Sequence, residues 1–400
     1  MLIEVHILQN HAPSNLNRDD TGSPKEAVFG GYRRARISSQ CLKRSIRRSD
    51  VFGAALGRRG YRTRTLPELV RKELEGSGLA PDLVNVAVQK ASGFGNKEGN
   101  EQKPNAAGVY RTAQTMFLTD ADVAAVAAVL KEAALEANTP EKLAKVKAQD
   151  LQKRAEDQGF RPLTVDIALF GRMVTSEAFL DVDASCQFAH AISTHKVDHE
   201  FDYFTAVDDL ERTAEDSAGS GADMIGDTEF NSACYYKYFN VHVEGLIDNL
   251  TGEGLPAKDR RPVSEEDKAT ARAAAADAVG ALIEAAVRVS PSAKQNSFAA
   301  FQLPSVVLVE VRPDNLPVSY ANAFVKPVDP SAREGIVGES AKRLKAEVET
   351  LTERFALKAD PRLLLACDPD FGICGVTRVQ TLPELIQTVR SEVLQAVRHA

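Results

Sequence analysis

Polar and apolar residues alternate at the very start of the chain. Over residues 3–7 the apolar side chains occupy every second position, which predicts a first strand. Residues 10–32 are rich in Asn, Pro, Ser and Gly, so we expect a long polar loop that can lie over a ligand. The segment Ile37-Ser38-Ser39 then predicts a turn into a helix that starts near Gln40, with one of the two serines as its N-cap.

Residues 51–160 have a different pattern, which is rich in alanine and helical in its periodicity. Thr65 precedes one predicted helix, and Thr119 caps another. A further helix is predicted to begin at Thr139 and to run as one piece to about Glu156. No strand is predicted here, so we interpret this block as a helical insertion.

Strand patterns return in the second half of the chain. Alternation predicts strands over residues 163–170 and 234–243, and an apolar run predicts another over 306–311. The capping box Ser264-Glu-Glu-Asp opens a long helix before that last strand. The core order is strand, helix, strand, strand, helix, strand, which predicts an α+β fold of the ferredoxin-like, RNA-recognition type. The tail, 331–400, is expected to add one or two helices.

The helix predicted to start near Gln40 has one strongly basic face. At about 100° per residue, four cations lie on the side of Gln40, and the opposite side can pack. Cations in the first turns of a helix oppose its positive dipole end, so an external polyanion would account for them. A solvated basic face explains the pattern equally well. The four cations are Lys43, Arg44, Arg47 and Arg48.

The composition, 44% hydrophobic and 26% charged, is typical of a soluble globular chain. The net charge of −7 taken alone argues against a nucleic-acid partner, but the charge is unevenly distributed. Residues 1–72 hold 15 Lys/Arg and 6 Asp/Glu, whereas residues 175–230 hold 2 and 14. Such a chain can bind a polyanion with its basic part, or stack head to tail on copies of itself.

Several function classes find no support in the sequence. Motifs for nucleotide phosphates and for serine hydrolases do not occur. No stretch resembles a signal peptide or approaches the length of a membrane span, so we predict no membrane contact. Five cysteines without a CxxC pair favour a reducing cytoplasm over a disulfide framework or a zinc site. We predict no cofactor.

Two groups of titratable residues invite a chemical interpretation. His195 and His199 are spaced at i, i+4 and could share a metal ion, but satisfied or exposed histidines are commoner, so no metal site is predicted. Asp19 and Asp20 could serve acid–base or metal chemistry. Aspartates in a turn more commonly cap the backbone, so we predict no catalytic residue.

Aromatic residues flank an acidic, Gly/Ser-rich segment, 208–221, which predicts a long hairpin over 200–240. Tyr203 and Phe204 could stack on bases. They could equally plug the base of the hairpin into the core.

Three lysines lie close together near the end of the helical block. On their own they are interpreted as a solvated face, and beside a second polyanion they would form a contact surface. They are Lys142, Lys145 and Lys147.

At this point the residues resemble a known family. The N-terminal block reads HAPSNLNRDDTGSPKEAVFGGYRRARISSQCLKRSIR. Later blocks, in the same order as in the family, read VDIALFGRMVTS, AHAISTHKVDHEFDYFTAVDDL, GDTEFNSACYYKY, AKQNSFAAF and LPVSYANAF. Together they resemble the CasC family, the backbone subunit of the type I-E CRISPR effector complex Cascade in the RAMP superfamily. The resemblance spans about 1–50 and 163–328, and the remaining segments match only in position and general character.

The resemblance implies a hand-shaped, non-catalytic scaffold. Its palm would comprise residues 1–50 and 161–330, with the hairpin 200–240 as a thumb. The helical insertion 51–160 would form fingers, and a helical extension, 331–400, would complete the palm. Copies of such a subunit stack head to tail along CRISPR RNA, together with other Cascade subunits. They present the guide to target DNA, which a recruited helicase-nuclease cuts.

The resemblance also implies roles for individual residues. Met173 and Thr205 would wedge at a kinked guide nucleotide, with Tyr203 and Phe204 beside them. The target DNA would contact Lys142, Lys145 and Lys147. The remaining guide-RNA contacts would be Arg18, Lys25, Ser38, Gln40, Lys43, Arg44, Arg47 and Lys294.

Two alternatives remain open. Arg33, Arg34 and Arg36 could contact the RNA or could equally hold the acidic region of a neighbouring copy. Related type III scaffold subunits cut RNA with an Asp in the corresponding loop, so the rival function is a metal-dependent RNA endonuclease that uses Asp19 or Asp20.

Overall fold

The structure, a computed structural model, describes residues 1–206, 224–255 and 262–395 and divides the chain into two compact units. Both units are assembled from segments that are separated in the sequence. We call them the sheet unit and the helical unit. The sheet unit comprises residues 1–52, 188–240 and 279–400, and the helical unit comprises 53–187 and 241–278.

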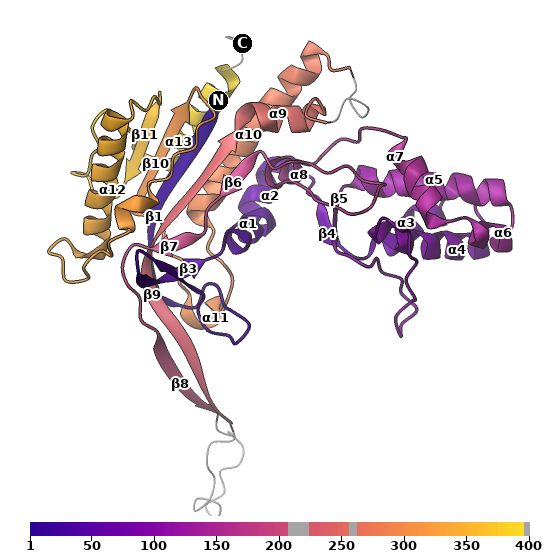
Figure 1. The fold of residues 1–400 in the computed structure, drawn as a ribbon, viewed down its shortest axis with the longest axis horizontal. Coiled ribbons are helices and arrows are strands. Elements are labelled where there is room, and N and C mark those ends of the chain that lie inside the picture. Colours follow the sequence, from indigo (N-terminus) through magenta and orange to yellow (C-terminus); the bar gives the residue numbers. More distant parts are fainter. Residues whose placement is uncertain (207–223, 256–261, 396–400) are drawn as a thin grey trace, which may run out of the picture. The chain divides into compact units, whose positions relative to one another are not determined.

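The sheet unit is built on a large mixed sheet, in which β1 lies between β10 and β9 (Figure 1). The main path of the sheet runs β12-β11-β10-β1-β9-β7-β3-β2, and β8 pairs with β9 to form a hairpin. Adjacent strands are antiparallel where their register is given, except for the parallel pair β11 and β12. These strands are β1 (Leu2–Ser14), β2 (Glu26–Phe29), β3 (Tyr32–Ile37), β7 (Ala191–Ser193), β8 (Glu200–Ala206), β9 (Met224–His242), β10 (Val306–Arg312), β11 (Arg362–Ala366) and β12 (Thr377–Arg378).

Helices cover both faces of this sheet. On one face, Leu42 and Ile46 of α1 line a small cavity together with Ile7 of β1. On the opposite face, Leu344 of α12 belongs to the same core cluster as Leu8 of β1. Neighbouring residues of a strand point to opposite faces, so β1 serves both core layers and is apolar at 7 and 8 alike. The helices are α1 (Ser39–Arg48), α10 (Glu265–Arg288), of which the part from residue 279 belongs to this unit, α11 (Gln295–Phe298), α12 (Gly335–Arg354) and α13 (Leu382–Gln395), with a 3₁₀ turn, η3 (Ala321–Phe324).

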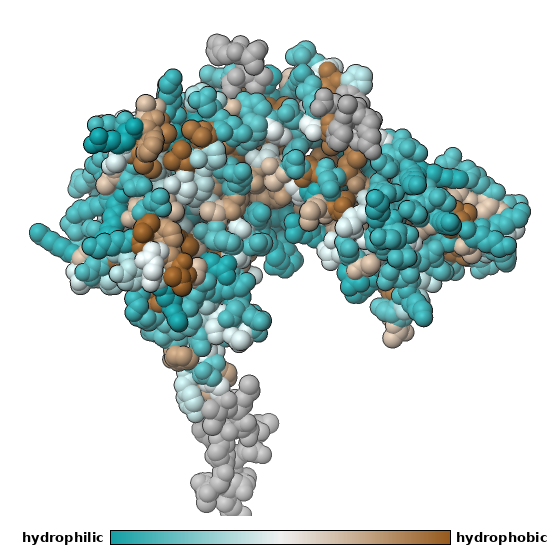
Figure 2. Space-filling view, viewed as in Figure 1, coloured by the Kyte–Doolittle hydropathy of each residue, from teal (hydrophilic) through white to brown (hydrophobic). Residues whose placement is uncertain are grey.

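The helical unit has its own core, formed mainly by apolar faces of α3, α4 and α5. Figure 2 shows the outer surface over α3 to α7 to be predominantly hydrophilic, as expected for helices that bury only one stripe. A short antiparallel pair, β4 and β5, lies beside these helices. The elements are α2 (Asp50–Leu56), β4 (Tyr61–Thr63), α3 (Leu66–Glu75), α4 (Pro81–Ala91), η1 (Ser92–Gly95), β5 (Met116–Leu118), α5 (Asp120–Ala137), α6 (Pro140–Lys145), α7 (Ala148–Glu156), α8 (Val165–Phe170) and α9 (Val243–Thr251). Strand β6 (Cys186–Phe188) belongs to the large sheet, where it pairs with β9.

Most of the strong local signals are confirmed. Ser38 is the N-cap of α1, and Thr119 forms a capping box at the start of α5. The Ser264 hydroxyl and Asp267 form the predicted capping box before α10. The strands predicted near the start of the chain and over 234–243 and 306–311 are also present.

The strand predicted over residues 163–170 is wrong, because Val165–Phe170 forms the short helix α8. Residues 167–170 are all buried, so no solvent-facing position interrupts the apolar run. A short continuous apolar run does not by itself distinguish a strand from a buried helix. The second core strand is therefore supplied by a later segment, β7.

Four other expectations need correction or completion. The helix predicted from Thr139 to Glu156 is broken into α6 and α7, since the backbone of Val146 is extended. The helical block contains a strand pair, and the tail adds β11 and β12 as well as its helices. The turn-rich segment is shorter than predicted, because β1 extends to Ser14 and β2 begins at Glu26.

Among the residues that the structure describes, no helix is both long enough and apolar enough to cross a membrane.

Candidate nucleic-acid interface

The basic helix α1 is anchored by its apolar side and by its N-cap. Leu42 and Ile46 are buried, as the periodicity predicts. The Ser38 hydroxyl accepts a hydrogen bond from the Cys41 backbone N–H at 3.3 Å, which satisfies one orphan donor of the first turn. Gln40 and Arg44 are exposed, and Lys43 is half-buried beside them. The predicted polar face of the helix is therefore at the surface.

The prediction that the cations of α1 oppose its helix dipole is wrong. The helix ends at Arg48, so Arg47 and Arg48 lie in its last turn. Cations at the C-terminal end of a helix interact favourably with its dipole. The basic face therefore needs no ligand to offset an intrinsic cost, and the case for an anionic partner rests on exposure and on the neighbouring groove.

An open groove lies between the loop 15–25 and strand β3. Three cations line it, namely Arg18, Lys25 and Arg36. Acidic side chains of the same loop and His199 complete the lining. The structure thus brings the predicted contacts Arg18 and Lys25 together and adds Arg36, whose Nε donates to the Glu26 backbone oxygen at 3.0 Å.

Asp19 holds the groove loop in shape. Its Oδ1 accepts hydrogen bonds from the Thr21 backbone N–H and the Thr21 hydroxyl, at 3.0 and 2.8 Å, and from the Ser23 backbone N–H at 3.0 Å. The Thr21 hydroxyl hydrogen bond, followed by backbone hydrogen bonds, lowers the pKa of Asp19 below its usual value. This is the turn-capping role that the sequence favoured for an aspartate here. Asp20 is exposed.

Arg34 belongs to the core and not to the surface. Its side chain is fully buried and donates to the backbone oxygens of Ser193, Phe324 and Val325, at 2.9, 2.7 and 3.1 Å. The expectation that Arg34 contacts RNA or a neighbouring copy is therefore wrong. Arg33, the adjacent residue, is exposed and pairs with Glu26 at 3.4 Å.

The predicted hairpin is formed by β8 and β9 and presents aromatic side chains to solvent. Tyr203 pairs with Asp227, and Phe204 pairs with Gly226. Tyr203 is 65% exposed and Phe204 is 41% exposed, so neither plugs the hairpin into the core. The adjacent Thr205 is exposed as well. The predicted acidic tip, 208–221, lies outside the described residues.

Lys294 supports the base of this hairpin. Its Nζ donates to the Thr228 hydroxyl of β9 at 3.1 Å, and its backbone has a positive φ of 48° just before α11. The side chain of Gln295 is buried and donates to the Pro291 backbone oxygen at 3.0 Å, which fixes the turn. Lys294 thus lies beside the hairpin, half-buried.

The other predicted contacts belong to the helical unit. Met173 follows α8 and is 91% exposed, an unusual position for a large apolar side chain. It lines an open pocket with Arg62 and Phe117. The three lysines are exposed, but they lie on α6 and at the α6–α7 junction and not along one helix face. These lysines are Lys142, Lys145 and Lys147.

The two histidines considered as metal ligands have separate partners. His195 Nδ1 lies 2.9 Å from the Lys196 backbone oxygen, and its Nε2 accepts from the Cys234 backbone N–H. His199 lies between two carboxylates, 2.7 Å from Glu26 and 2.9 Å from Glu229. The pair therefore forms no shared metal site.

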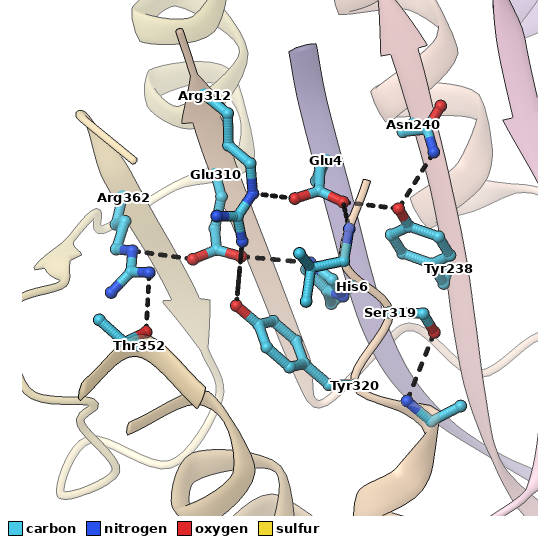
Figure 3. A network of polar contacts seen from close by, with 12 residues as sticks. Glu4, His6, Tyr238, Asn240, Glu310, Arg312, Ser319, Tyr320, Thr352 and Arg362 are labelled. Atoms are coloured by element: carbon cyan, nitrogen blue, oxygen red, sulfur yellow. Dashed lines mark hydrogen bonds and ion pairs between the residues drawn. The ribbon is translucent and has the colours of Figure 1, made fainter. Parts of the chain in front are cut away.

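One buried polar cluster of the sheet unit does have the ligand types of a metal site. Glu4, His6 and Glu310 approach one another within 4.8 Å (Figure 3). Arg312, however, pairs with both carboxylates, and Arg362 pairs with Glu310 at 2.8 Å. Two guanidinium groups already neutralise the two acids, so we interpret the cluster as a buried ion-pair network that joins β1, β10 and β11.

The pKa of Glu310 reports the strength of this network. Burial works to raise it, but the His6 hydrogen bond and the charges of His6, Arg312 and Arg362 outweigh burial and lower the pKa to about 2. Glu310 therefore stays ionised in the folded protein at any ordinary pH.

Some residues that shape the interface were missed from the sequence. Asn17 Oδ1 accepts the Ser38 backbone N–H at 2.8 Å and ties the groove loop to α1. His190 Nδ1 accepts the Ser39 backbone N–H at 3.0 Å. Both contacts join residues far apart in the chain, so no local pattern signals them. Arg36 is predicted from the sequence as a contact to RNA or to a neighbouring copy, and the structure places it in the groove lining.

Fold and surface together define the class: an α+β protein that presents a basic helix and groove and an aromatic hairpin. A sequence profile of the CT1975-like protein family matches residues 3–388, so the chain belongs to this family. None of the curated proteins compared matches the chain.

Two solved structures have the same fold. One is a chain of a structure titled "CRISPR RNA-guided surveillance complex, pre-nicking", with 27% sequence identity and a TM-score of 0.79, covering 98% of this chain and 100% of that one. The other belongs to a "CRISPR RNA-guided surveillance complex", with 24% identity and a TM-score of 0.70, covering 98% and 99%. The second likeness is a likeness of fold alone.

Proposed function

We propose that the protein is a non-catalytic scaffold that binds CRISPR RNA in a surveillance complex. The observation that carries this proposal is the likeness, over the whole length of both chains, to a chain of an RNA-guided surveillance complex at 27% identity. The exposed side of α1 and the cations Arg18, Lys25 and Arg36 of the groove beside the loop 15–25 supply contacts for a phosphate backbone.

We propose further that, within surveillance complexes, the protein belongs to the type I-E CasC family. Its ferredoxin-like palm is supported by the strand neighbours, since the first strand, β1, lies between β10 and β9 and β9 is followed by β7. Helices α1 and α10 occupy the two crossover positions of a strand–helix–strand–strand–helix–strand order. The hairpin β8–β9 is the thumb, and the helical block of residues 51–160 supplies the fingers.

The residue roles follow from exposure. The exposed face of α1, with Arg18 and Lys25, contacts the phosphates of the guide RNA. On the hairpin, Tyr203, Phe204 and Thr205 contact the kinked nucleotide. Met173 acts as a wedge because its exposed thioether side chain can insert between bases. The lysines of α6 and its junction with α7 face target DNA. Copies stack head to tail along the RNA with other Cascade subunits, and a recruited helicase-nuclease cuts the DNA.

The direct test replaces Lys43, Arg44 and Arg47 by Ala together. Each lost phosphate contact on single-stranded RNA should reduce the slope of log K against log salt by about 0.7, so the triple variant should lose about 2. A matched control replaces three cations of α12, Lys342, Lys345 and Arg354, which changes the net charge equally. RNA affinity measured by fluorescence anisotropy at several salt concentrations, and RNA content after purification, give the readout.

Retention of the full salt slope by the α1 triple variant would overturn the assignment of the basic helix. An equal loss in the α12 control would show that the effect is one of net charge alone.

The non-catalytic part of the proposal is supported by the structural use of Asp19 in the groove loop. Complementary RNA incubated with the assembled complex and Mg²⁺ should therefore remain intact. The contrary result, site-specific cuts that disappear in Asp20→Ala, would make the protein an RNA endonuclease. Asp20→Ala is the cleaner variant, because Asp20 is exposed and Asp19 holds the loop.

A further inference from the structure

His190 lies where the sheet meets the start of the basic helix. Strands β3 and β7 are antiparallel, with Arg36 opposite Ile192 and Ile37 opposite Ala191. Continuing this register by one residue places His190 opposite Ser38, the N-cap of α1. The imidazole Nδ1 accepts a hydrogen bond from the backbone N–H of Ser39, the first residue of the helix, at 3.0 Å.

The first turn of α1 is thereby held from separate parts of the chain. The Ser38 hydroxyl binds the Cys41 N–H, and Asn17 Oδ1 binds the Ser38 N–H. His190 is the contribution of a segment 151 residues away from Ser39. The Ser38 cap is a contact within the helix start, whereas the His190 hydrogen bond links the first residue of α1 to the segment beside strand β7. A helix that carries ligand contacts on its first turns depends on such an anchor for its direction.

The bond requires an unprotonated Nδ1, since a protonated imidazole can only donate. Two cations face His190, Lys25 from the groove loop and Arg36 from β3. The His190 side chain is exposed, but the desolvation that remains, then the charges of Arg36 and Lys25, lower its pKa below the usual value. The environment therefore favours the neutral, accepting form.

We propose that neutral His190 is a positioning residue for RNA binding, because it fixes the first turn of α1 and with it the contacts of Gln40, Lys43 and Arg44. This inference rests on the proposed function. His190 acts through the helix and does not itself contact a phosphate. Protonation removes the acceptor and releases the start of α1 from the sheet.

The test compares His190→Ala with His190→Asn. The Asn Oδ1 occupies the place of Nδ1 and accepts the same hydrogen bond, but it does not titrate. We expect His190→Ala to weaken RNA binding by about fivefold, the effect of losing one helix cap, and His190→Asn to stay within about twofold of the wild type. As the pH falls through the lowered pKa of His190, the wild type should lose affinity progressively relative to His190→Asn.

An RNA-free readout separates this inference from the proposed function. Hydrogen exchange in a peptide over 39–46 should be faster in His190→Ala than in the wild type or His190→Asn, with exchange in α5 unchanged. Equal exchange in all three proteins would overturn the positioning role, even if RNA binds. A gain of affinity at low pH in the wild type alone would also overturn it, because His190 would then act as a cationic phosphate contact. Failure of the wild type to bind RNA would instead count against the proposed function.

Discussion

At the scale of single residues, burial separates structural cations from surface cations that are adjacent in the sequence. Arg33 is exposed, whereas Arg34 is fully buried among backbone oxygens. The planar guanidinium of Arg34 reaches three carbonyls at once, a geometry that a lysine ammonium on a flexible stem does not reproduce. Its role is to join β3 to residues 193 and 324–325.

We therefore predict that Arg34→Lys lowers the free energy of unfolding by about 3 kcal/mol, since buried carbonyls lose their donors. Arg33→Lys, the matched control, should change it by less than about 0.5 kcal/mol. Urea denaturation of both variants checks this. A small effect of Arg34→Lys would show that the ammonium satisfies the same carbonyls.

Two further titratable residues, His11 of β1 and Lys237 of β9, are buried. Burial, and then the charge of Lys237, lower the pKa of His11 to about 4. Burial lowers the pKa of Lys237 itself to about 8. Lys237 donates a hydrogen bond to Gln9 and lines the small cavity beneath the apolar side of α1.

The His11 shift predicts a loss of stability in acid. The unfolded chain takes up a proton near pH 6.5 and the folded chain only near pH 4, so stability falls as the pH drops through this window, by up to about 3 kcal/mol. Lys237→Met should raise the pKa of His11 and reduce this loss. The exposed control Lys342→Met should not. Histidine ring titration by NMR gives the readout, and an unchanged pKa in Lys237→Met would contradict the assigned cause.

At the scale of elements, the capped helix α5 shows how one residue can serve several partners. Asp122 completes the Thr119 capping box, because its Oδ2 accepts a hydrogen bond from the Thr119 backbone N–H at 2.9 Å. The same carboxylate pairs with Arg172 at 2.7 Å and with Arg161 at 3.3 Å, and its side chain is 1% exposed. The start of α5 is thus tied to two later segments of the helical unit.

Asp122→Asn should cost about 3 to 5 kcal/mol of stability, because it leaves two guanidinium groups without their buried counter-charge. Asp150→Asn, at the exposed start of α7, is the control and should cost less than about 1 kcal/mol. Thermal and urea unfolding would reveal the difference. Similar costs for the two variants would mean that Asp122 acts only as a helix-dipole charge.

The elements that could be predicted are those with local signals. Helix α1 combines an N-cap serine with a clean two-sided periodicity, and both survive in the structure. Helix α8 has no exposed polar side, so its apolar run does not distinguish a helix from a strand. The apolar run of residues 363–366 carries a strand signal, from which β11 is predictable.

The candidate site was predictable only where its members are neighbours in the chain. The α1 cations and the hairpin aromatics are clustered in the sequence. The contacts of Arg34, Asn17 and His190 depend on strand pairing between distant segments, as the His190–Ser39 bond shows. The sequence allows Tyr203 either to contact bases or to pack into the core. Its 65% exposure excludes the core position, and exposure is known only for the folded chain.

At the scale of the whole molecule, the ion-pair network of Figure 3 spans three strands of the sheet unit. We predict that Glu310→Gln leaves Arg362 without its counter-charge and lowers the stability of the sheet unit by about 3 kcal/mol. Hydrogen exchange should accelerate in β1, β10 and β11 and stay unchanged in α5 of the helical unit. Equal acceleration in α5 would show that the two units unfold together.

The division of the chain into discontinuous units also has a consequence for synthesis. Strand β1 is made first, yet Leu2 pairs with Arg312 of β10. The helical unit has all its segments once residue 278 is made, whereas the sheet unit continues to the end of the chain. Domains fold as units when their residues become available during translation. We therefore expect the helical unit to fold first on the ribosome. The segment that carries α1 can fold only after the later strands of its sheet have been made. Nascent chains stalled once residue 278 has left the ribosome should protect α5 from protease but leave α1 open to it, so that only a finished chain is ready to bind RNA.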